Sequence, residues 1–321
     1  MPESKIVTLT MNPAIDKNAS VKQVEPNRKL RCQDPSFSPG GGGINVARAV
    51  HKLGGEVKAI YPAGGPTGDM LEQLLEKEKI PNRRIKIESW MRESFAVTEE
   101  TTNNQYRFEM PGPHLRETEW KNCLEVILEE SQNADFLVAS GTLPPGVPDD
   151  FYAQLAGKAR SSRLKLIVDT SGEPLKKIKG KGLFLLKPNL RELCALTGLE
   201  LVSEEDQEKA ARELVTNGTC EVLVLSLGAA GVLLVTRDYK KRFRSPAVPV
   251  KSRIGAGDCT VAGIVLGLTR KMDLIKSILF GISSGVAAVM TPGTELCRKE
   301  DAERIFYSMK EVNKKIADLI Q

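Results

Sequence analysis

The chain has 321 residues, of which 41% are hydrophobic and 27% charged, a composition typical of a globular protein and not of a long disordered segment. Its 46 basic and 41 acidic residues give a net charge of +5, and the basic residues are scattered, so no nucleic-acid partner is expected. No apolar run reaches membrane-spanning length and residues 1–20 lack a signal-peptide pattern, so we expect no membrane partner and a cytoplasmic location. The 6 cysteines are widely spaced without a Cys-x-x-Cys pair, which indicates reduced thiols and argues against zinc and disulfide bonds.

Short apolar runs alternate with amphipathic stretches along the chain, and this alternation predicts an α/β fold with a mainly parallel sheet covered by helices. No linker or internal repeat divides the chain, so residues 1–321 are interpreted as a single domain. In chain order we predict a strand at 6–10, a helix at 44–53, a strand at 58–61, helices at 67–78 and 117–130, a strand at 136–140, a helix at 149–159, strands at 164–169 and 182–186, a helix at 204–216, a strand at 222–226, a hairpin over 231–248, and helices at 256–270, 273–289 and 301–316.

Two polar, extended stretches interrupt this alternation, at about 17–38 and 92–111. Both follow a predicted core strand, so a small sheet formed by them would lie over the carboxyl ends of the strands, where ligands bind in open α/β folds. We therefore predict a lid made of β-strands. Small open sheets rarely stand alone, so the exposed face of the lid is expected to pair with a second subunit in a homodimer.

Charged side chains mark both the end of the first strand and the predicted lid. Asp16 follows that strand closely, which is a position suited to binding a substrate. Lys29 and Arg31 lie in the first lid stretch and Arg92 opens the second, so these cations could face a phosphorylated ligand. As isolated residues such cations are more often part of a solvated surface, and it is their place on the predicted lid that favours a ligand.

Four consecutive glycines, residues 40–43, lead into the helix predicted at 44–53. Such a run costs backbone entropy, which close approach of a ligand to Gly41 and Gly42 would offset, although a flexible turn is the alternative. Asn45 lies at the start of the helix and can bond sugar hydroxyls. The run is not a P-loop, because no Gly-x-x-x-x-Gly-Lys-Ser/Thr pattern occurs. It is not a dinucleotide-binding loop either, because no Gly-x-Gly-x-x-Gly pattern follows the first strand.

A polar segment, residues 187–192, follows the strand predicted at 182–186. Asn189 and Glu192 lie three residues apart on one face of a starting helix, where a carboxylate can hold Mg²⁺ through water. The alternative is a structural N-cap formed by the same two side chains. Both interpretations are compatible with each other.

The run Gly255, Ala256, Gly257 and Asp258 opens an apolar helix. Small residues at a helix N-terminus let unpaired backbone N–H groups approach an anion such as a transferring phosphoryl group. Asp258 could accept the proton of an attacking hydroxyl, or it could simply cap an ordinary helix. With only 2 histidines in the chain, a histidine-centred mechanism is not expected, and Asp258 is the better candidate for a general base.

Together with residues 140–146, these three ordered motifs resemble the phosphofructokinase B family of ribokinase-like carbohydrate kinases over nearly the whole chain. The resemblance implies a three-layer fold with a mainly parallel central sheet and a small β-sheet lid. Within that family, residues 29–32, 39–49 and 105–108 are most similar to the bacterial minor 6-phosphofructokinases. Tagatose-6-phosphate and 1-phosphofructokinases usually carry a lysine at the position of Gly42, which favours fructose 6-phosphate as the acceptor.

The resemblance also implies roles for individual residues. Asp258 is the general base, and the amides of residues 255–257 stabilise the moving phosphoryl group of ATP. Lys29 and Arg92 meet phosphate groups, with Lys29 bridging donor and acceptor. Glu192 organises Mg²⁺, and K⁺ is a further candidate cofactor. The remaining binding positions are Asp16, Gly41, Gly42, Asn45 and Thr142 for the sugar, and Lys187, Asn189, Ser226 and Gly228 for the nucleotide.

Two positions depart from the family pattern. Arg253 stands where relatives carry a threonine before the catalytic glycines, and Glu295 stands where the closest relatives carry a basic residue. These changes put the nucleotide-phosphate geometry and K⁺ binding in question. The alternatives to a 6-phosphofructokinase are a tagatose-6-phosphate kinase, a 1-phosphofructokinase and a regulator that has lost catalysis. A dinucleotide oxidoreductase would need a glycine fingerprint that this sequence lacks.

Overall fold

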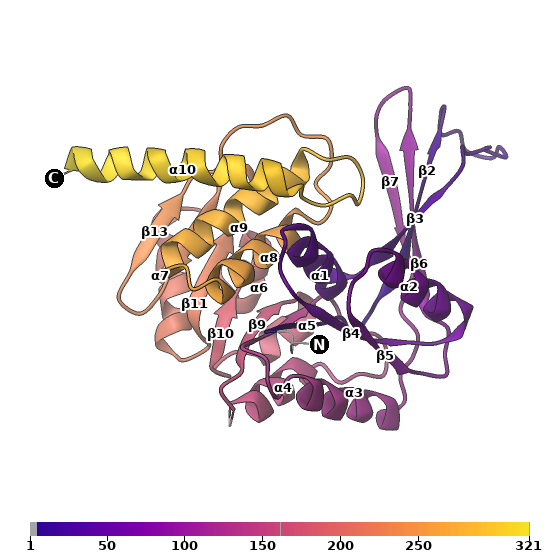
Figure 1. Ribbon diagram of the computed structural model, residues 1–321, viewed down its shortest axis with the longest axis horizontal. Helices are drawn as coiled ribbons and strands as arrows, with labels where there is room; N and C mark the ends of the chain where they lie inside the picture. The colour runs from indigo at the N-terminus through magenta and orange to yellow at the C-terminus, as the bar shows by residue number, and fades with distance from the viewer. Residues whose placement is uncertain (1–4, 161, 321) are drawn as a thin grey trace.

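A computed structural model describes residues 5–160 and 162–320, and within them the largest sheet has nine strands. The strands from β11 to β5 run parallel, while β12 and β13 form an antiparallel hairpin at one edge (Figure 1). The order across the sheet is β13 (Lys240–Phe243), β12 (Val232–Val235), β11 (Cys220–Ser226), β10 (Leu183–Leu186), β9 (Lys165–Asp169), β8 (Phe136–Ser140), β1 (Ile6–Leu9), β4 (Lys58–Ala63) and β5 (Asn82–Lys86).

Helices cover both faces of this sheet and create two apolar cores. The central strands are mostly apolar, as expected of strands whose two faces are both buried. Successive residues alternate between the two cores, so Ile6 packs on one side and Val7 on the other. One core receives α1 (Gly42–Lys52), α2 (Gly65–Lys77), α8 (Ala256–Thr269), α9 (Leu274–Val289) and α10 (Lys299–Ile320), and the other receives α3 (Glu117–Glu130), α4 (Phe151–Ala159), α5 (Gly172–Lys177), α6 (Leu190–Thr197) and α7 (Glu204–Thr216). This is the three-layer α/β fold that the sequence predicts.

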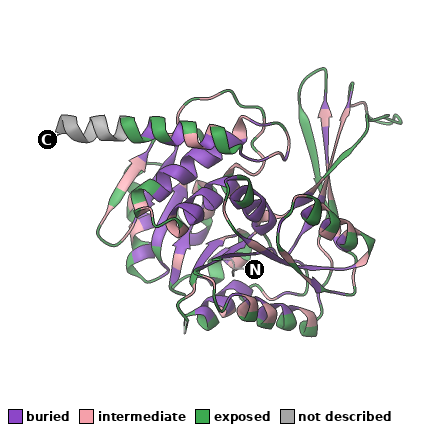
Figure 2. Cartoon of the chain, viewed as in Figure 1, coloured by how far each residue is buried: buried purple, intermediate pink, exposed green. Residues whose placement is uncertain are grey.

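The second sheet has the order β3, β2, β6, β7 and projects from the body of the molecule (Figure 1). Its central pair, β2 and β6, is parallel, and the outer strands are antiparallel to them. Strand β7 is exposed along its whole length (Figure 2). The predicted small sheet is therefore confirmed, and we call it the lid. Its strands are β2 (Ala14–Val21), β3 (Ser36–Gly40), β6 (Arg92–Glu99) and β7 (Gln105–Glu109).

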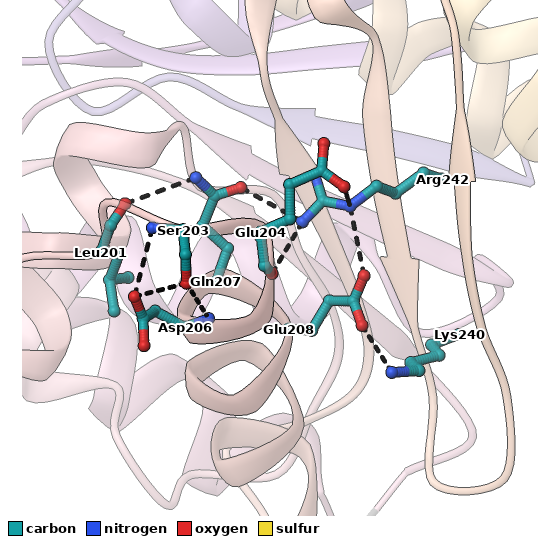
Figure 3. A network of polar contacts seen from close by, with 8 residues as sticks. All are labelled: Leu201, Ser203, Glu204, Asp206, Gln207, Glu208, Lys240 and Arg242. Atoms are coloured by element: carbon teal, nitrogen blue, oxygen red, sulfur yellow. Dashed lines mark hydrogen bonds and ion pairs between the residues drawn. The ribbon is translucent and has the colours of Figure 1, made fainter.

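Ion pairs hold the edge strand β13 of the central sheet against α7. Arg242 Nε lies 3.2 Å from Glu208 Oε1, and Lys240 Nζ lies 2.5 Å from Glu208 Oε2 (Figure 3). The N-terminus of α7 is closed by a capping box in which the Ser203 and Asp206 side chains each accept from the other's backbone N–H. Charged side chains along an exposed edge also oppose pairing with another strand. No helix within residues 5–160 and 162–320 is both long and apolar enough to cross a membrane.

Candidate active site

The parallel strands β1, β8, β9, β10 and β11 end at the same edge of the central sheet. Polar side chains stand at or just after each of these ends. Ligand sites of open α/β sheets form just outside this edge, because the loops that follow the strands converge there. We call this region the crevice. The residues concerned are Asn12, Thr142, Asp169, Lys187 and Ser226.

The N-terminus of α8 opens with Gly255 in the left-handed conformation, at φ 72°. A Cβ atom at this position would lie 2.4 Å from Leu296 Cδ2, so no larger residue fits without displacing that leucine. Gly257 follows in the first turn, and a Cβ there would lie 3.5 Å from Lys187 Nζ. A buried ammonium group therefore lies beside the N-terminus of the helix, an arrangement that is suited to binding an anion.

Asp258 lies in the same turn and accepts a hydrogen bond from Asn45 Nδ2 at 3.0 Å. The structure thus brings together two residues that are 213 positions apart in the chain. Burial and, after it, the nearby Asp169 carboxylate raise the pKa of Asp258, Asn45 and Lys187 oppose them, and the pKa that results is about 6. A carboxylate with this pKa is ionised at neutral pH and can accept a proton readily.

Lys187 is almost completely buried and forms an ion pair with Asp169, with 3.0 Å between Nζ and Oδ2. Burial alone would lower the pKa of Lys187, but the charge and hydrogen bond of Asp169 raise it overall, so the side chain is a fixed cation. Asp169 is a site residue that the sequence analysis missed. Its signal was its place as the last residue of a predicted strand, where it could reach the same crevice as Lys187.

Asn189 and Glu192 form the N-cap of α6 that was one of the two interpretations of this segment. The Asn189 side chain accepts from the Glu192 N–H at 2.9 Å, and Glu192 Oε2 accepts from the Asn189 N–H at 2.8 Å. Burial raises the pKa of Glu192, as does the charge of Asp169. Asn189 also pairs with Ser226 across the strand ends, and Gly228 begins the exposed turn that follows.

The glycine run is explained by packing within the protein. A Cβ on Gly40 would lie 2.5 Å from the Asp16 carboxyl group, and one on Gly42 would lie 2.3 Å from Ser140 Oγ. Gly41 has a φ of 109°, which side-chain-bearing residues rarely adopt, and a Cβ there would lie 2.6 Å from Thr10 Cγ2. The alternative interpretation, a flexible turn, is therefore wrong. Close contact with the ends of β1, β2 and β8 requires these glycines and places the N-terminus of α1 at the crevice.

The lid brings Asp16 and Arg92 to the crevice but holds Lys29 elsewhere. Burial raises the pKa of Asp16, while Arg107 and Arg92 counteract this effect. Arg107, on β7, was not among the predicted site residues. Arg92 donates to the backbone oxygens of Asn12 and Met110, at 3.2 and 3.3 Å. Lys29 is exposed in the segment that links the far ends of β2 and β3, so the structure does not place it beside Asp258.

Comparison with known proteins gives one family for this chain. Residues 4–301 match the pfkB family carbohydrate kinases. The ATP-dependent 6-phosphofructokinase isozyme 2 of Mycobacterium tuberculosis (strain ATCC 25618 / H37Rv) is 49% identical over 302 residues, covering 94% of this chain and 89% of the relative. The protein of the same name from Escherichia coli (strain K12) is 41% identical over 303 residues, covering 94% and 98% of the two chains.

Solved structures of phosphofructokinase-2 from Escherichia coli have the same fold. The complex with fructose 6-phosphate has a TM-score of 0.90 at 40% identity and covers 96% of this chain and 99% of that chain. A complex with potassium has a TM-score of 0.92, with the same identity and coverage. A tetrameric inhibited form of that protein has a TM-score of 0.90, again with the same identity and coverage.

Proposed function

Because this chain belongs to the pfkB family of carbohydrate kinases, we propose that it transfers the γ-phosphoryl group of ATP to O1 of fructose 6-phosphate, giving fructose 1,6-bisphosphate. Its relatives named ATP-dependent 6-phosphofructokinase are 49% and 41% identical over most of their length. The observation that carries the proposal is Asp258 in the first turn of α8, next to the glycine amides and the buried Lys187.

In the proposed reaction Asp258 accepts the proton of the sugar O1 hydroxyl as O1 attacks the γ-phosphorus. The O1–P bond forms, the bond between that phosphorus and the β,γ-bridging oxygen breaks, and ADP leaves with the electron pair. The N–H groups of residues 255–257 and the Lys187 ammonium stabilise the negative charge on the transferring group. Asn45 orients Asp258 through the hydrogen bond to Oδ2.

The nucleotide is proposed to lie along Lys187, Asn189, Ser226 and Gly228, which line the ends of β10 and β11. Magnesium would neutralise the phosphates of the bound nucleotide. Asp169 raises the pKa of both Asp258 and Glu192, so a nearby cation would relieve the repulsion among these carboxylates. Within the described ranges no group of three or more His, Cys, Asp or Glu side chains forms a metal cage, which suits an ion held by Glu192, water and phosphate.

The sugar is proposed to lie between the lid and the N-terminus of α1. Asp16 and Asn45 present oxygens to its hydroxyl groups, and Asn45 Oδ1 is buried without a hydrogen-bond partner among the described residues. Gly41, Gly42 and Thr142 complete this subsite. Arg92 would meet the 6-phosphate at the base of the lid, and Lys29 would reach a phosphate only when its segment folds toward the crevice or comes from a second subunit.

A substrate-panel assay tests the proposal. Purified protein is supplied with Mg-ATP and fructose 6-phosphate, tagatose 6-phosphate or fructose 1-phosphate, with and without K⁺. We expect the highest kcat/KM with fructose 6-phosphate. A higher value with either other acceptor would reassign the specificity, and no turnover of any of the three would refute the proposal. Because the related protein has been solved with potassium, we propose that K⁺ raises the activity here, despite exposed Arg253 in the preceding loop.

We further propose that the whole chain is one catalytic domain and that two copies pair through their lids. The lid exposes Phe37, Tyr106 and Phe108, of which Phe108 is 51% exposed. Aromatic side chains on an open sheet favour burial against a partner. A dimer would also place the segment that carries Lys29 next to a second molecule.

A further inference from the structure

Asn12 occupies a buried position between two of the proposed substrate-binding residues. It follows β1 in the chain and is only 8% exposed. Its Nδ2 group donates a hydrogen bond to Thr142 Oγ1 at 3.1 Å, and its backbone oxygen accepts from Arg92 Nη2 at 3.2 Å. Asn12 therefore contacts both the end of the central sheet and the base of the lid.

The hydrogen bond from Asn12 determines whether the Thr142 hydroxyl acts as a donor or an acceptor toward other groups. Because Thr142 Oγ1 accepts from the amide, its own hydrogen is directed toward another acceptor. Thr142 is exposed at the crevice, so this hydrogen points to solvent in the free protein and is available to a ligand oxygen that displaces the water. Arg92, which the same asparagine holds through its backbone oxygen, adds a positive charge and a buried Nε atom that has no partner among the described residues. Two donors held by one asparagine suit a group that offers only acceptors, such as a phosphate.

The position of the Asn12 amide is limited by the segment that leaves the lid. A Cβ atom on Gly112 would lie 2.2 Å from Asn12 Oδ1, so the amide packs directly against that glycine. Oδ1 is buried without a partner among the residues described, which costs free energy that a purely structural asparagine would not need to incur. An unsatisfied buried group of this kind requires an explanation, and a functional role is one of those known.

We propose that Asn12 is a positioning residue for the 6-phosphate of the acceptor, fixing the Thr142 hydroxyl as a donor and the Arg92 guanidinium within reach. This inference rests on the proposed function. It assigns the phosphate end of the acceptor to the space in front of Thr142 and Arg92. Asn12 itself does not touch the reacting atoms.

Calorimetric titration with fructose 6-phosphate and with ATP tests this inference, using Asn12→Asp, Thr142→Val, Thr142→Ser and the double variant Asn12→Asp/Thr142→Val. A carboxylate at position 12 keeps the shape of the amide but accepts the Thr142 proton, which removes the donor from the ligand. We expect Asn12→Asp and Thr142→Val each to raise the Kd for fructose 6-phosphate about tenfold or more, as loss of a hydrogen bond to a charged group does. Thr142→Ser should stay within about threefold of the wild type.

The double variant separates positioning from general structural damage. If Asn12 acts through Thr142, the double variant binds fructose 6-phosphate about as weakly as Thr142→Val alone, and the Kd for ATP stays within about twofold in every variant. Unchanged binding by Asn12→Asp, additive losses, or an equal loss of ATP affinity would overturn the inference. Turnover is measured on the same wild-type sample. If the wild type phosphorylates fructose 6-phosphate while the variants bind normally, only the inference fails, whereas absence of binding and turnover in the wild type overturns the proposed function as well.

Discussion

Asp258 carries a charge that its surroundings disfavour, because burial and Asp169 raise its pKa to about 6. Replacement by Asn keeps the shape of the side chain but removes the proton acceptor. We predict that Asp258→Asn lowers kcat by a factor of about 10² to 10⁴, the usual contribution of a positioned general base. Fructose 6-phosphate should still bind, which titration calorimetry would check. Full turnover by this variant would assign the base elsewhere.

The same substitution should stabilise the fold. A folded-state pKa above the unfolded value means that the ionised carboxyl costs stability at pH above about 6, and that this cost disappears as the pH falls toward 4. Asp258→Asn should therefore raise the free energy of unfolding at pH 8 by about 1–3 kcal/mol. The gain should be absent near pH 4. Denaturant unfolding at the two pH values measures this difference, and a variant less stable than the wild type at pH 8 would contradict it.

Asp169 links the pKa of the base to the nucleotide site. Its negative charge raises the pKa of Asp258, so Asp169→Asn should lower that pKa and move the acidic limb of the kcat profile to lower pH. The base is active when ionised, so the wild-type rate should fall as the pH drops below about 6. The ionisation of the sugar phosphate affects both profiles equally when the substrate is the same, so a difference between the profiles comes from the protein. An unshifted limb would mean that Asp169 does not influence the base.

Among the elements, the N-terminus of α8 depends most strongly on one residue. Gly255→Ala would place a left-handed alanine 2.4 Å from Leu296 Cδ2, so both the strain and the steric clash should disturb the amides that face the phosphoryl group. We predict a loss of kcat of about tenfold or more, following the loss of transition-state stabilisation. Activity assays and thermal unfolding on the same preparation measure both effects.

Gly180→Ala is the matched control for Gly255→Ala. Gly180 has a φ of 73°, nearly that of Gly255, but a Cβ there has open space around it. This variant should lose about 1–2 kcal/mol of stability from backbone strain alone and keep full activity. Equal losses of activity in the two variants would show that strain anywhere in the chain inactivates the protein, and would remove the special role of α8.

The periodic parts of the fold could be predicted from the sequence, whereas parts that depend on neighbours could not. The helices α3 and α7 have the predicted bounds, because each combines an amphipathic pattern with a clear N-terminal signal. Strand β5 was not predicted, since its sequence Asn-Arg-Arg-Ile-Lys is polar and only pairing with β4 makes it a strand. The short helix α5 was not predicted either, and it ends with the basic residues Lys176 and Lys177.

The same distinction applies to the candidate site. Asp258, Asn45 and Lys187 were found through local motifs, and the structure places them together. Asn12 and Asp169 belong to no such motif. Their relevance arises from contacts with Thr142 and Lys187 across neighbouring strands, which a single sequence does not specify. The glycine run was found correctly, but its cause, close packing on three strand ends, required the three-dimensional arrangement.

At the scale of the whole molecule, the projecting lid predicts association. We expect sedimentation equilibrium at assay concentrations to give a mass twice that of the 35.2 kDa chain. Phe108→Glu, on the exposed strand β7, should shift the protein toward the monomer by placing a charge in the interface. The matched control is Tyr307→Glu, because Tyr307 is 61% exposed but lies on α10, away from the lid. A wild-type monomer, or equal dissociation by both variants, would argue against pairing through the lid.

Phosphoryl transfer to O1 is tested most directly by ³¹P NMR of a reaction that contains the wild-type protein, fructose 6-phosphate and Mg-ATP. We predict a new phosphate resonance on C1 that grows in step with ADP, an unchanged resonance at C6, and no detectable product from Asp258→Asn over the same time. ADP released without a sugar bisphosphate, or the same product formed at the wild-type rate by Asp258→Asn, would contradict this mechanism.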